Sequence, residues 1–126
     1  MRIAMVTDYY LPTLGGVQTA VKSLREALTS AGHEVTVFCP LHAESTDAGI
    51  VRLPTSKRFR PDGYPFAWSP RRLVAAMRRE FVARGIQLVH VHAGMYSSIA
   101  AILVVSEPAP TVIYTMHGRL DVYVMN

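Results

Sequence analysis

The fold of this chain is decided by residues 2–39, RIAMVTDYYLPTLGGVQTAVKSLREALTSAGHEVTVFC. Two apolar runs flank a segment whose apolar residues recur at the spacing of one helix face. Gly32 stands directly after this segment, where helices commonly end because glycine accepts a left-handed backbone. The stretch therefore predicts a strand at Arg2–Thr7, a helix at about Val17–Ala31 and a strand at Glu34–Cys39.

The remainder of the chain continues this alternation of strands and helices. Continuously apolar strands that alternate with helices are typical of a parallel sheet covered on both faces. We expect strands at Gly49–Leu53, Gln87–His92 and Thr111–Thr115, and helices at about Pro70–Gly85 and Met95–Val105. The predicted fold is a single Rossmann-like α/β domain over residues 1–126, with strand order 3-2-1-4-5. Its last strand would be an uncovered apolar edge, which indicates a truncated domain.

The composition limits the class of protein. Half of the 126 residues are apolar, enough for a buried core, and the one cysteine, Cys39, excludes a disulfide framework. The longest apolar run, residues 99–105, is far shorter than the roughly 20 residues that span a bilayer. Asp8 ends the N-terminal apolar run before a signal-peptide core could form. These features favour a cytoplasmic protein with Cys39 as a small buried residue.

Positive charge is concentrated in one part of the chain. The net charge is +4, but nine Lys or Arg and only two acidic residues lie between Arg52 and Arg84. Four arginines flank the apolar stripe of the predicted second helix: Arg71, Arg72, Arg78 and Arg79. They form either an ordinary solvated face or a surface for anionic lipid headgroups. Nucleic acid is disfavoured, because no aromatic residues are interleaved for base stacking and no helix-turn-helix pattern occurs.

Four features follow predicted strands and should meet where ligands bind to an open parallel sheet, outside the carboxyl ends of its strands. They are Gly15-Gly16, Pro40, His92 and His117-Gly118. The paired glycines would let a phosphate or a sugar approach the unpaired amides at the start of a helix. The alternative is a flexible turn. A dinucleotide site is disfavoured, since the glycines form no GxGxxG pattern and no Walker lysine follows.

Three histidines are candidates for chemistry. His117 would project from the tip of the last strand, where it could hydrogen-bond a sugar or phosphate, and Gly118 would leave amides free to face that ligand. The alternative is an ordinary loop histidine. His90 and His92 are two apart on a strand and face the same way, but no third metal ligand is evident. We expect no metal, with His90 packed under a helix and His92 facing the cleft.

Four blocks of the sequence carry a family resemblance. They are Thr7–Pro12 with Gly15–Val17, Leu24–Val37, Val89–His92 and Tyr114–Gly118. In this order and spacing they resemble the N-terminal half of the retaining glycosyltransferases of family 4, which have the GT-B fold. The resemblance covers almost the whole chain.

The resemblance implies the acceptor-side domain of an enzyme that transfers a sugar, with retention, from a nucleotide-sugar to a sugar or lipid acceptor. Gly15, Gly16 and Gly118 would approach the donor's diphosphate or the transferred sugar. His117, as the catalytic residue, would hydrogen-bond that sugar, and Tyr9 and His92 would border the acceptor. Helix-start amides can stabilise the departing diphosphate without a metal ion or cofactor.

The sequence also departs from the family. Members have a second Rossmann-like domain, which carries basic residues for the diphosphate and a paired-glutamate motif. These 126 residues contain no part of that domain. We therefore expect this chain alone to be inactive. The basic helix resembles the membrane-docking region of phosphatidylinositol mannosyltransferases, which implies peripheral contact with the inner face of a membrane.

Two other functional hypotheses compete with that of a sugar transferase. A non-catalytic module that binds a phosphorylated sugar or anionic lipid headgroup remains the alternative. A receiver or flavodoxin-like domain is disfavoured, because no acidic cluster follows the first strand and no lysine lies near Thr115.

Overall fold

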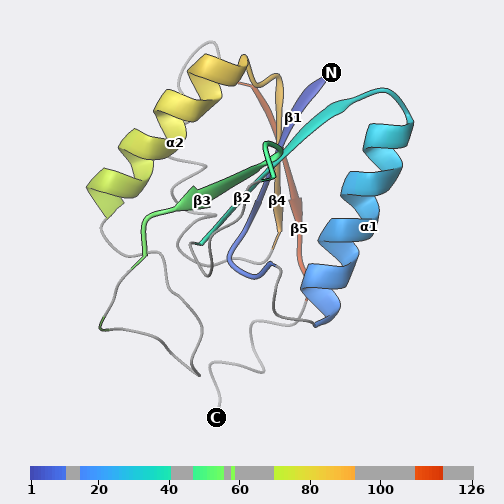
Figure 1. Cartoon of the computed structure of the whole chain (residues 1–126), viewed down its shortest axis with the longest axis horizontal. Coiled ribbons are helices and arrows are strands. Elements are labelled where there is room, and N and C mark those ends of the chain that lie inside the picture. The colour runs from blue at the N-terminus through green and yellow to red at the C-terminus, as the bar shows by residue number, and fades with distance from the viewer. Residues whose placement is uncertain (11–14, 41–46, 56–57, 59–69, 93–109, 118–126) are drawn as a thin grey trace.

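The computed structural model describes residues 1–10, 15–40, 47–55, 58, 70–92 and 110–117. Along the chain, these residues form β1 (Arg2–Thr7), α1 (Gly16–Ser30), β2 (Glu34–Pro40), β3 (Ile50–Leu53), α2 (Pro70–Arg84), β4 (Leu88–His92) and β5 (Thr111–Thr115). The strands form one parallel sheet in the predicted order, β3-β2-β1-β4-β5. Figure 1 shows α1 and α2 on opposite sides of this sheet.

The helix α2 packs its apolar stripe on one face of the sheet. Leu73, Met77 and Phe81 are buried against strand residues that include Val6 and Phe38. The rings of Phe38 and Phe81 meet edge to face, with centroids 5.0 Å apart, which is a preferred aromatic geometry. This packing leaves Arg71, Arg72, Arg78 and Arg79 exposed on the outer side of the helix.

The helix α1 covers the other face. Val21 is fully buried against the side chains that β1 and β2 turn toward it, including Met5 and Val37. Cys39 belongs to the same cluster and is buried, as predicted. Its burial raises the pKa of the thiol to about 11, so Cys39 is a packed thiol and not a reactive thiolate.

Both helices end in the same way. Gly32 and Gly85 adopt positive φ angles of 89° and 57°. The amide of the residue after each glycine donates back into the last turn, His33 to Leu28 and Ile86 to Phe81. This is the arrangement of a Schellman helix end, in which the left-handed residue is usually glycine.

The predicted elements agree with the structure to within about one residue at their ends. The predicted helix at Met95–Val105 lies outside the described residues. β5 is an edge strand, and its side chains Val112, Ile113 and Tyr114 are 40%, 43% and 43% exposed. Neither helix within the described ranges is long and apolar enough to cross a membrane.

Candidate functional site

The carboxyl ends of three neighbouring strands meet at one side of the sheet, here called the carboxyl edge. Thr7 of β1 pairs with His92 of β4, and His92 pairs with Thr115 of β5. His117 follows two residues after β5. The start of α1 lies at this edge as well, because the helix runs back along the sheet after β1 (Figure 1). The paired glycines and His117, distant in sequence, therefore belong to one edge of the molecule.

His92 and His117 are in direct contact. Nδ1 of His92 lies 2.9 Å from Nε2 of His117, and the two rings are stacked with centroids 5.2 Å apart. His117 is exposed, whereas His92 is 2% exposed. A ligand at the carboxyl edge can therefore reach His117 directly and His92 mainly through His117.

His90 lies behind His92 on the same face of β4. The two rings are 4.0 Å apart between centroids, and Nε2 of His90 is 2.7 Å from the hydroxyl of Thr115. The predicted shared face of the two histidines is confirmed. Among the described residues, no group of three His, Cys, Asp or Glu side chains is arranged to hold a metal ion.

Burial keeps the inner two histidines neutral. The pKa of His92 falls to about 3, first because burial penalises its charged form and then because of repulsion from His90 and His117. The pKa of His90 is also lowered, mainly by burial and then by His117. Near pH 7 both are therefore neutral hydrogen-bonding groups.

The start of α1 is open. Gly15 is the N-cap in an extended conformation, and no side-chain cap or acidic first-turn residue is present in the described part of this helix start. A Cβ placed on Gly15 would meet the side-chain amide of Gln18, whereas one placed on Gly16 would meet no atom of the described residues within 4 Å. The backbone beside Gly16 is therefore free to be approached, and first-turn amides of this kind attract anions.

Tyr9 is held by a tight turn after β1. The hydroxyl of Thr7 donates to the carbonyl of Tyr9 at 2.9 Å and accepts from the amide of Tyr9 at 3.2 Å. Two polar residues in this part of the chain, Asp8 and Gln18, are buried, and neither was predicted as a site residue from the sequence. A glutamine one turn before buried Val21, on the inward face of α1, was the signal that could have identified Gln18.

The structure does not bring every candidate to the carboxyl edge. Arg71, Arg72, Arg78 and Arg79 are exposed on α2, whose stripe covers the sheet face opposite to the histidines. The arginines are therefore a separate surface from the histidine cluster. Gly118 lies outside the described residues.

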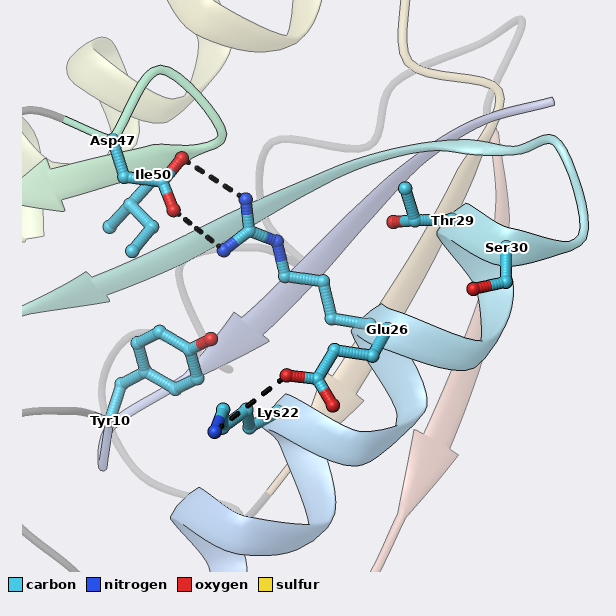
Figure 2. A pocket seen from close by; sticks show the side chains of 8 residues that line it. Tyr10, Lys22, Glu26, Thr29, Ser30, Asp47 and Ile50 are labelled. Atoms are coloured by element: carbon cyan, nitrogen blue, oxygen red, sulfur yellow. Dashed lines mark hydrogen bonds and ion pairs between the residues drawn. The ribbon is translucent and has the colours of Figure 1, made fainter.

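A pocket of about 470 Å³ lies beside α1, between this helix and the segment leading into β3. Arg25 of α1 donates from its two terminal nitrogens to the two carboxylate oxygens of Asp47, at 2.9 and 3.1 Å. Figure 2 shows Asp47 and Tyr10 facing the same space. The bond to Arg25 lowers the pKa of Asp47. This pair connects α1 to the β3 lead-in, and local sequence patterns did not predict it.

The sequence of this chain is similar to a known family and to known proteins. A family model described as Glycosyltransferase Family 4 matches residues 14–125. The alpha-monoglucosyldiacylglycerol synthase of Acholeplasma laidlawii is 29% identical over 128 residues, which cover 98% of this chain. The phosphatidyl-myo-inositol mannosyltransferase of Mycolicibacterium smegmatis is 52% identical over 40 residues, which are 32% of this chain and 10% of that protein.

A solved structure supports the fold. The sucrose-phosphate synthase of Thermosynechococcus elongatus superposes with a TM-score of 0.74 over 99% of this chain and 35% of its own, at 19% identity. The sheet is thus the Rossmann-like N-terminal half of a GT-B fold. This chain spans 31% of the length of the Acholeplasma synthase.

Proposed function

Because this chain belongs to glycosyltransferase family 4, we propose that it is the acceptor-side domain of an enzyme that moves a sugar from a nucleotide-sugar to an acceptor with retention. The observation that carries the proposal is the presence of the open α1 start and exposed His117 at one carboxyl edge. The amides at the start of α1 suit an anion, and the ring of His117 suits a sugar hydroxyl.

In this proposal the start of α1 receives the leaving group. Breaking the bond between sugar and phosphate places negative charge on the departing diphosphate. The first-turn amides beside Gly15 and Gly16 carry partial positive charge and are already oriented, so they stabilise that charge as it develops. This part of the chemistry needs neither a metal ion nor a cofactor.

The remaining groups bind the sugar and the acceptor. His117 hydrogen-bonds the transferred sugar, and Gly118 allows its neighbouring amides to approach the donor. Tyr9, held by the Thr7 turn, borders the acceptor. His92 completes this acceptor side through its contact with His117.

We further propose a lipid acceptor and peripheral membrane contact. Two of the similar proteins are named for glucosyldiacylglycerol synthesis and for phosphatidyl-myo-inositol mannosyl transfer. The exposed arginines of α2 offer positive charge to a membrane surface. Each basic residue near an anionic surface contributes about 1 kcal/mol to the binding free energy. In the complete enzyme a second, donor-binding domain supplies most of the nucleotide pocket, and this chain alone does not turn over sugar.

The test is a transfer assay on the full product of the gene. Labelled nucleotide-glucose and nucleotide-mannose would be offered with vesicles containing diacylglycerol or phosphatidylinositol, and with soluble sugars. Transfer to a vesicle lipid is expected. If the full product transfers no sugar while the 126-residue chain binds a phosphorylated sugar or headgroup by calorimetry, the non-catalytic binding module is the better account.

A further inference from the structure

The two ring nitrogens of His92 have different surroundings. Nδ1 is 2.9 Å from Nε2 of His117. Nε2 is buried, and no hydrogen-bond partner for it is found within the described part of the chain. A neutral imidazole carries one proton, so one nitrogen donates and the other accepts.

Only two neutral arrangements are compatible with the short contact. In the first, His92 carries its proton on Nδ1 and donates it to Nε2 of His117. In the second, His117 donates from Nε2, and His92 must then carry its own proton on the buried Nε2. The second arrangement leaves a polar N–H group buried without an acceptor among the described residues, and such an unpaired donor is the rarer and more costly defect in folded proteins.

A third arrangement, with both nitrogens of His92 protonated, is excluded near neutral pH. The ring is buried, and its pKa lies at about 3. Neither ring nitrogen of His90 is a partner for Nε2 of His92, since that atom has no hydrogen bond among the described residues, and Nε2 of His90 lies instead 2.7 Å from the hydroxyl of Thr115. The ring of His90 is tilted against that of His92 with centroids 4.0 Å apart, and it restricts how the ring of His92 can turn.

We propose that His92 is a positioning residue that donates its Nδ1 proton to Nε2 of His117 and thereby keeps neutral His117 protonated on Nδ1. The exposed His117 then presents an N–H donor away from His92 at the carboxyl edge. This inference rests on the proposed function. It makes His117 a hydrogen-bond donor to a hydroxyl oxygen of the sugar and not a hydrogen-bond acceptor.

The first test is a nitrogen-15 NMR measurement on the wild-type chain at about pH 8, where neutral imidazoles can be observed. Long-range proton–nitrogen correlations distinguish a protonated from a bare ring nitrogen, and a His117→Gln variant assigns the signals of His117. We expect His117 to show a protonated Nδ1 and a bare Nε2. A bare Nδ1 with a protonated Nε2 in the wild type would overturn the proposal.

A pair of substitutions of the same shape isolates the role of His92. His92→Asn retains a side-chain N–H donor near the position of Nδ1, whereas His92→Leu has none. We expect His117 to remain protonated on Nδ1 in His92→Asn and to lose that preference in His92→Leu. An unchanged His117 tautomer in folded His92→Leu would contradict the assignment.

Folding of each variant is checked by its backbone amide spectrum, and the wild-type measurement decides the question if His92→Leu does not fold. The NMR experiment needs neither a nucleotide-sugar nor turnover. A failed transfer assay would therefore count against the proposed function, while the tautomer of His117 would still report on His92.

Discussion

Nδ1 of His92 and Nε2 of His117 lie 2.9 Å apart although 25 positions separate the two residues in the chain. The parallel register of β4 and β5 produces this contact, because it pairs His92 with Thr115 and leaves His117 just beyond the sheet. One histidine is thereby buried and neutral, and the other is exposed at the end of the same row. The carboxyl edge thus has an inner histidine, His92, that orients His117, and an outer histidine, His117, that can bind a ligand.

Replacing His117 with alanine should abolish sugar transfer by the full enzyme with little effect on folding. His117 is exposed, so its loss leaves no large cavity, whereas loss of a hydrogen bond made in the transition state lowers kcat by about 100-fold or more. The control is His33→Ala. His33 contacts the amine of Met1 and directly precedes β2, so it lies at the end of that strand opposite to the carboxyl edge. Equal activity of the two variants would remove His117 from the site.

Gly16→Ala should separate binding from stability. Among the residues that the structure describes, none lies within 4 Å of a Cβ at this position, and alanine is a better helix former than glycine. We expect an unchanged or slightly raised Tm. We also expect a lower kcat/KM for the nucleotide-sugar, because the methyl group would occupy the space beside the first-turn amides. Wild-type kcat/KM would show that no substrate approaches Gly16.

Neutralising the four exposed arginines of α2 should weaken binding to anionic vesicles. They are Arg71, Arg72, Arg78 and Arg79. At about 1 kcal/mol for each charge near the surface, the loss should be large at low salt and small at high salt. Vesicle sedimentation measures it, with Lys22→Gln on the opposite side of the sheet as the control for a general charge effect. Unchanged binding would leave these arginines as ordinary surface charge.

Stability should fall as the pH is lowered from about 6.5, because His92 is protonated more readily in the unfolded chain than in the folded one. Its folded pKa of about 3 lies below the ordinary value of 6.5, so its contribution is complete above pH 6.5 and is lost as the pH falls toward 3. Between pH 6.5 and pH 5 the loss should reach up to about 2 kcal/mol.

Urea titrations of the wild type and of His92→Asn would measure this pH dependence. The variant lacks the titrating ring and should lose less stability over the same interval, although His90 contributes in the same direction. Identical pH dependence of the two proteins would show that His92 does not carry the effect.

Met77→Ala should lower the free energy of unfolding by about 2–5 kcal/mol, since Met77 is fully buried between α2 and the sheet and its truncation leaves a cavity. Val82→Ala on the same helix is the matched control, because Val82 is 77% exposed and its loss should change stability by less than about 0.5 kcal/mol. Similar losses in both variants would contradict the observed packing of α2.

The sequence by itself determined the elements of the described sheet and their order. Apolar runs, helical spacing and glycines at both helix ends are local signals, and alternation of strands with helices restricts the connections to a parallel sheet. The same signals placed Gly15, Gly16, His92 and His117 at one edge, because the carboxyl ends of parallel strands always meet.

Only the tertiary structure decided how these residues touch. The contact between His92 and His117 depends on strand register and on ring orientations, and the bond between Arg25 and Asp47 depends on how α1 packs beside the lead-in to β3. Neither is encoded in a local pattern, since each joins segments more than 20 positions apart. Burial of His92, which sets its charge and its role, likewise arises when separate segments pack around one ring.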